Sequence, residues 1–178
     1  MSILGKLFRS DRNEPPEIDL DAPSFAPHDL AELLFQLTLK SAQSAADAFA
    51  KHTLFSETSR DSAIEELILF FAWRTYCKLG DSFDVCDRFT YKIGTFLADV
   101  YRDKKAMESV CTKLDARIKE YSDLMRAMSG SDNLELCTRA AGFTLNQSLP
   151  GFDGIALAVH LSTFDTMADS FVVRLVKR

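Results

Sequence analysis

The sequence has few of the residues and motifs that would identify an enzyme or a metalloprotein. It contains three histidines, seven glycines and five prolines in 178 residues. No histidine stands in an H-E-x-x-H or E-x-x-H pattern, so the usual helical zinc and di-iron sites have no ligands here. No glycine motif for phosphate binding or for a nucleophile elbow occurs either. We therefore identify no catalytic residue, no metal site and no cofactor, and we favour a non-catalytic protein.

Cysteine pairs and long apolar runs are also missing. Cys77, Cys86, Cys111 and Cys137 form no C-x-x-C pair, and each lies in an apolar stripe, which is typical of small hydrophobic residues in a reducing compartment. The longest apolar run, residues 67–73, covers seven residues. A transmembrane helix needs about 20 residues, and no signal peptide is recognisable. We expect a soluble, cytoplasmic protein with no transmembrane segment.

The charge balance is mildly acidic. The 21 Lys and Arg residues are scattered among 26 Asp and Glu, which gives a net charge of −5. Proteins that bind nucleic acid usually present a basic face, so we do not expect a nucleic-acid partner. Hydrophobic residues make up 47% and charged residues 26%, as in an ordinary globular protein. The length suits one domain that buries roughly 70% of its unfolded surface.

Positions predicted to face inward recur at alternating steps of four and three between Cys86 and Met128, and eleven of the thirteen are apolar, which predicts helix. The positions are Cys86, Thr90, Ile93, Leu97, Val100, Lys104, Met107, Cys111, Leu114, Ile118, Tyr121, Met125 and Met128. A single helix over 82–129 would be about 70 Å long. We predict two helices with a break near 101–105, where Lys104 interrupts the apolar pattern and Asp103 can cap a new helix.

The rest of the chain is also predicted to be helical. Pro27 suits the first turn of a helix that runs to about residue 51. The sequence from Ser62 to Glu65 matches a capping box, which predicts the start of a second helix that ends at Gly80. Apolar side chains of residues 64–79 point in nearly every direction, so this helix should be central. Further helices are expected over 132–149 and 153–176, although β-branched residues leave a strand possible at 171–176. The predicted fold is an all-α, single-domain bundle of five to six helices.

Residues 1–26 differ from the bundle domain predicted over 27–178. They comprise a basic arm, residues 1–12, and a Pro-rich acidic tether, and we expect them to be flexible. In the arm, Ile3, Leu4, Leu7 and Phe8 share one helical face, with Lys6 and Arg9 beside them. This face suits a membrane surface or a partner protein. The alternative is a clip that packs on the protein's own core.

Arg74 is the most unusual single residue, because it lies between Trp73 and Tyr76 in an aromatic helix. It either has a structural role, as an ion pair or stacked on an aromatic ring, or recognises an anion in a pocket walled by Trp73 and Tyr76. Two Asp pairs one helical turn apart, Asp99/Asp103 and Asp165/Asp169, are the best case for an enzyme because they could hold Mg²⁺. The helical period turns these acids toward solvent, so we assign them to solvated faces.

Two function classes follow. The first is a non-catalytic interaction or regulatory domain with a protein partner, supported by the basic arm and the absence of catalytic motifs. The second is a helical pocket for a small molecule or lipid around Trp73, Arg74 and Tyr76, which includes the case of an unrecognised enzyme. Peripheral membrane contact through residues 1–12 fits either class, and the oligomeric state is left open.

Overall fold

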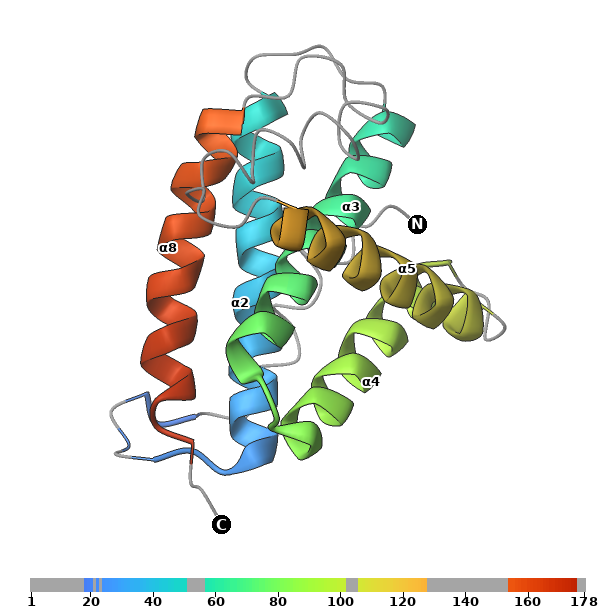
Figure 1. Ribbon diagram of the computed structural model, residues 1–178. Coiled ribbons are helices and arrows are strands. Elements are labelled where there is room, and N and C mark those ends of the chain that lie inside the picture. Colours follow the sequence, from blue (N-terminus) through green and yellow to red (C-terminus); the bar gives the residue numbers. More distant parts are fainter. Residues whose placement is uncertain are drawn as a thin grey trace.

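The computed structural model describes residues 18–20, 22, 24–50, 57–101, 106–127 and 154–175. These residues form five α-helices and no strand (Figure 1). The helices are α2 (Pro27–Ala50), α3 (Glu57–Leu79), α4 (Phe83–Tyr101), α5 (Ala106–Ala127) and α8 (Gly154–Val172). The predicted all-α bundle is therefore confirmed. No helix in the described part of the chain has the length and apolarity needed to cross a bilayer.

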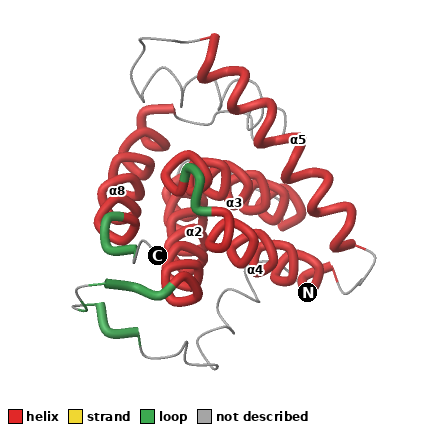
Figure 2. The backbone as a smooth tube through the Cα atoms, turned by 60° about the horizontal axis from the view of Figure 1, so that its bottom comes forward, coloured by secondary structure: helices red, strands yellow, loops and turns green. Residues whose placement is uncertain are grey.

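Helix α3 lies at the centre of the bundle. It contacts α2, α4, α5 and α8, whereas α2 packs against α3, α4 and α8. Helices α4 and α5 diverge from the point where the chain passes from one to the other (Figures 1 and 2). Between Ala63 and Trp73 every α3 residue except Glu65 is buried. A helix that is apolar all round must be surrounded, so the predicted central helix is confirmed.

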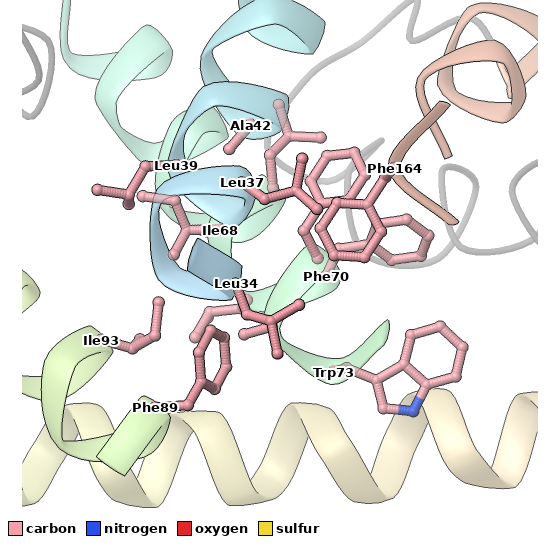
Figure 3. Packing of buried hydrophobic residues seen from close by; sticks show 14 of the residues in the cluster. Leu34, Leu37, Leu39, Ala42, Ile68, Phe70, Trp73, Phe89, Ile93 and Phe164 are labelled. Carbon is pink, nitrogen blue, oxygen red and sulfur yellow. The ribbon is translucent and has the colours of Figure 1, made fainter. Parts of the chain in front are cut away.

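Side chains from α2, α3, α4 and α8 point into the core around α3 (Figure 3). The second half of α2 carries small residues, and Ala42, Ala45 and Ala46 are all buried. Small side chains let neighbouring helices approach closely, which is why α2 packs against three of them. Aromatic rings fill the wider spaces: Phe71 of α3 and Phe164 of α8 have ring centroids 5.0 Å apart.

The ends of α3 show one incorrect and one correct prediction. The helix begins at Glu57, so the predicted start at the Ser62 capping box is wrong. Residues 57–61 contain no Pro or Gly, and nothing in them stops the helix from extending past Ser62. At the other end Gly80 has φ of 53°, and its N–H donates to the Tyr76 carbonyl at 3.2 Å. Gly80 therefore caps α3 as predicted, because glycine adopts a left-handed conformation without steric cost.

The long apolar pattern is divided between two helices, as predicted. Helix α4 ends at Tyr101 and α5 begins at Ala106, while the capping role of Asp103 lies outside the described residues. The side chains of the pattern are mostly buried or half-buried, and Val110 beside it is 5% exposed. Met125, predicted to face inward, is 39% exposed, and it lies in the last turn of α5.

The two ends of the described chain meet beside α2. After α8, Leu175 forms a single parallel bridge with Phe25, so residues 171–175 are helix and turn and not a strand. The Phe25 N–H donates to the Arg174 carbonyl at 2.8 Å, and the Phe25 ring, 2% exposed, packs edge-on against Phe171. Packing thus begins before Pro27. Residues 1–17 and the helix predicted over 132–149 lie outside the described residues.

Phe71→Ala should destabilise the bundle strongly, because Phe71 is 0% exposed and its ring packs against Phe164. We expect a loss of about 3–5 kcal/mol of unfolding free energy, or roughly 6–20 °C in melting temperature for a chain of this size. Urea and thermal unfolding followed by circular dichroism measure it. Phe83→Ala is the matched control, because Phe83 is 73% exposed, and it should change stability by no more than about 0.5 kcal/mol. Equal losses would contradict the described core.

Candidate binding groove

The three residues predicted to form a ligand pocket are directed to three different helices. The Trp73 indole N–H donates to Ser122 Oγ of α5 at 3.2 Å, and its ring lies 5.3 Å from that of Tyr121. The Tyr76 hydroxyl bonds Thr90 Oγ1 of α4 at 2.6 Å. Arg74 turns toward α8. In this structure the three side chains connect α3 to its neighbours, and none of them lines the groove described below.

Arg74 forms a bidentate ion pair with Asp165 of α8. Its Nε and Nη2 atoms donate to the two carboxylate oxygens at 2.8 and 2.7 Å, and each side chain is 12% exposed. The hydrogen bond to Asp165 is the main reason that the pKa of Arg74 is raised, against the opposing effect of burial. The two planar groups match in shape, which makes this the strongest kind of side-chain ion pair. The structural role considered for Arg74 thus has a named partner.

Asp165 was predicted to face solvent, and that prediction is wrong: its residue exposure is 9%. It lies one position after the buried Phe164 and four after the buried Leu161, at the edge of the apolar stripe, so α8 carries it inward. Asp169, one turn further, is 60% exposed and pairs with Lys78 at 2.8 Å. Asp99 is exposed as predicted, and Asp103 lies outside the described residues. No group of His, Cys, Asp or Glu within the described ranges is arranged to hold a metal ion.

Asp165→Ala should destabilise the protein, because it leaves the Arg74 guanidinium without its partner in a mostly buried position. We expect a loss of about 3–5 kcal/mol, measured by urea unfolding. The double variant Arg74→Met, Asp165→Leu should recover most of the loss, because it removes both charges. Asp169→Ala breaks an exposed pair and should cost at most about 1 kcal/mol. A small loss in Asp165→Ala would contradict the pairing.

Tyr76 gives a prediction for alkaline pH. Burial is the largest cause that raises the pKa of its hydroxyl, to about 12, whereas a tyrosine in an unfolded chain titrates near 10. Between about pH 10 and pH 12 the unfolded chain loses this proton before the folded chain does, so the free energy of unfolding falls as the pH rises. Tyr76→Phe should make that fall shallower in urea midpoints measured from pH 9 to 11.5. An unchanged slope would count against a buried, protonated Tyr76.

A groove with a volume of about 680 Å³ lies between α2 and α4 and is open to solvent. Residues of α2 at steps of about four positions form one wall, and a matching series on α4 forms the other. The lining residues are His28, Asp29, Glu32, Phe35, Asp87, Arg88, Tyr91, Lys92, Thr95, Phe96 and Asp99. From Arg88 to Asp99 the α4 wall is about 17 Å long by the rise of an α-helix.

Aromatic rings form the apolar part of the groove. Phe35 of α2 and Phe96 of α4 meet edge-to-face with centroids 6.0 Å apart, and Phe96 is 8% exposed. Tyr91, one to two turns before Phe96 on α4, is 65% exposed. The groove therefore offers a partly covered aromatic surface beside an exposed aromatic ring, and both can contact an apolar ligand.

Carboxylates outnumber basic side chains around the groove. Asp29, Glu32, Asp87 and Asp99 face Arg88 and Lys92, so the lining has a formal charge of −2 with His28 neutral. The two basic side chains are both paired. Lys92 donates to Glu32 across the groove, and Arg88 donates to Asp84 on its own helix at 3.0 Å. Asp87 is exposed and takes part in none of the ion pairs between described residues. The groove is thus acidic as well as apolar.

The sequence pattern did not indicate this groove. The apolar stripe of α4 contains Phe89, Ile93 and Leu97, which face the core, whereas Tyr91 lies on the opposite side of the helix. An exposed aromatic residue off the buried stripe was the one available signal. The arm residues Ile3, Leu4, Lys6, Leu7, Phe8 and Arg9 lie outside the described residues.

Comparison with known proteins gives no further identification. The chain matches no family model, no curated protein and no solved structure. Function must therefore be argued from the chemistry of the groove itself.

Proposed function

We propose that this protein is a non-catalytic interaction domain of the cytoplasm, and that the groove between α2 and α4 binds a basic amphipathic helix of a partner protein. One observation carries the proposal: a single open groove combines aromatic surface with an excess of carboxylates. An apolar stripe on a partner helix would cover the rings, and lysine or arginine beside that stripe would face the acids.

The dimensions of the groove suit a short helix. Its α4 wall of about 17 Å corresponds to roughly three turns of a partner helix. The groove is open to solvent, so a helix can lie in it without being enclosed. Amphipathic helices bind such grooves through apolar residues spaced three and four positions apart. Phe35, Tyr91 and Phe96 are placed to receive those residues.

The charges favour a cationic protein segment over a nucleic acid or an anionic lipid. Asp87 and Asp29 lie near the start of the α4 and α2 walls, and Asp99 lies near the other end of the α4 wall. Carboxylates in these positions attract lysine and arginine and repel phosphate. The ring of Tyr91, 65% exposed, can also stack against a cationic side chain.

A small-molecule function is the second candidate, because the groove volume of about 680 Å³ is within the roughly 300–1,000 Å³ of drug-sized ligand sites. The same chemistry would require a ligand with an apolar body and a positive charge. Native mass spectrometry of the purified full chain separates the two candidates. A retained small mass that is lost in Tyr91→Ala would favour the pocket, and a bare chain would favour the protein partner.

The proposed function can be tested with a synthetic peptide of about 14 residues, made only of leucine and lysine in an amphipathic pattern. Fluorescence anisotropy measures its binding to the full chain carrying Leu7→Asp and Phe8→Asp, so that the chain's own apolar arm does not compete. Adding Tyr91→Ala should weaken binding about tenfold. Adding Phe83→Ala is the matched control, because Phe83 is an exposed aromatic residue of α4 outside the groove, and it should change affinity less than twofold.

A leucine–glutamate peptide of the same length tests the role of charge, and it should bind at least tenfold more weakly. Asp87→Lys should weaken the lysine peptide and reduce the salt dependence of its binding, since Asp87 is an exposed carboxylate of the groove. Equal binding of the two peptides, or equal losses in Tyr91→Ala and Phe83→Ala, would contradict the proposed function.

A further inference from the structure

We infer that the groove between α2 and α4 is occupied by the chain's own N-terminal arm, residues 1–12, and that a partner helix binds by displacing it. This inference rests on the proposed function, because it concerns the regulation of the same groove. It assigns to the arm a specific docking site within the chain in place of a membrane or an external protein.

The arm has the pattern that the groove requires. Ile3, Leu4, Leu7 and Phe8 are spaced three and four positions apart and fall on one face of a helix. This is the spacing by which helices bind grooves. The leucine, isoleucine and phenylalanine side chains would cover the aromatic surface formed by Phe35 and Phe96, whose rings lie at the groove.

Charge complementarity supports the same placement. The arm contains Lys6, Arg9 and Arg12 with one acid, Asp11, while carboxylates exceed basic side chains in the groove lining. Lys6 and Arg9 flank the apolar face, so a docked arm would direct them toward the rim, where Asp29 and Asp87 lie. The protein as a whole is acidic. The basic arm is therefore opposite in sign to the chain as a whole, and the acidic, aromatic groove matches it in charge and in apolar surface.

The lengths of the arm and of the tether are consistent with docking in the groove. Ile18 packs against the core nine residues before Pro27, and the groove wall starts at His28, the second residue of α2. The chain between Arg12 and Ile18 can extend roughly 20 Å at about 3.3–3.6 Å per residue. As a helix, residues 1–12 would be about 18 Å long, close to the groove wall of about 17 Å.

The tether determines how strongly the arm competes. A short flexible linker gives an effective concentration on the order of 1 mM. If the arm alone bound the groove with a dissociation constant near 100 μM, that effective concentration would make the docked state about ten times as populated as the undocked state. A partner peptide would then bind the wild-type chain about tenfold more weakly than a chain whose arm cannot dock. At this level of occupancy the arm covers the groove most of the time, and a partner helix can still displace it.

The experiment compares the leucine–lysine peptide on the wild-type full chain and on the Leu7→Asp, Phe8→Asp chain. We expect about tenfold tighter binding to the variant. Lys6→Glu, Arg9→Glu should produce the same increase by reversing the arm's charge. Ser10→Ala, Asn13→Ala is the matched control, because it changes two residues outside the apolar face, and it should leave affinity within twofold of wild type.

A further variant strengthens the arm. Gly5 disfavours helix, so Gly5→Ala should stabilise the docked helix and weaken the added peptide by up to about fivefold. In two-dimensional NMR spectra, Leu7→Asp, Phe8→Asp should shift the backbone signals of Tyr91 and Thr95. The signals of Phe83 should stay in place, because it is outside the groove.

The outcomes distinguish this inference from the proposed function. If the peptide binds the wild-type and variant chains with equal affinity and still depends on Tyr91, the groove is a binding site and the arm does not occupy it. If it binds neither chain, both proposals fail. If wild-type chain co-sediments with phosphatidylserine vesicles and Lys6→Glu, Arg9→Glu abolishes this with no change in peptide affinity, the arm is a membrane element and the inference is overturned.

Discussion

The burial of α3 on every side is the constraint on which the rest of the structure depends. A helix that is apolar all round needs neighbours in every direction, and each polar group on it then needs a partner from one of those neighbours. Every neighbouring helix supplies one. Thr75 contacts Thr38 of α2 at 3.4 Å, Tyr76 bonds Thr90 of α4, Glu66 pairs with Arg117 of α5, and Arg74 pairs with Asp165 of α8. The polar groups of α3 therefore specify which helix packs on which side.

This constraint explains why the most conspicuous residues of the sequence are structural in this fold. Arg74 and Glu66 are charged groups in a mostly buried helix, and a buried charge without a partner costs several kcal/mol. Their partners satisfy them, with Glu66 bonded by two Arg117 nitrogens at 2.9 and 3.1 Å. The binding chemistry lies instead between α2 and α4, in a groove that contains no α3 residue. There Phe35 packs against Phe96 and Lys92 pairs with Glu32, which joins α2 to α4, while exposed Tyr91 and Asp87 are available to a ligand.

Local patterns predicted the helices, and tertiary placement determined the site. Apolar periodicity located α4 and α5 and the break between them, and it identified α3 as central. It also indicated that Arg74 needs a partner, but Asp165 is 91 residues away in the chain. Asp165 lies at the edge of the apolar stripe that contains Phe164. That position suggests an inward-facing acid only when Arg74 is known to need a partner on a neighbouring helix. The groove depends on how α2 and α4 pack side by side. The apolar periodicity within one helix does not predict how two helices pack.

The outer face of α8 shows why charge is decisive for the groove. Ile155, Val159 and Met167 are 43–65% exposed there, and the hydroxyls of Thr163, Thr166 and Ser170 donate to backbone carbonyls of their own helix. That face is apolar but has little to select a partner with, since specificity comes from groups that reject the wrong ligand as well as attract the right one. The α2–α4 groove adds the exposed carboxylate of Asp87 to its aromatic surface. Of the two described apolar surfaces, it is the one whose chemistry specifies an occupant, and the segment of opposite charge and matching apolar spacing is at the start of the same chain.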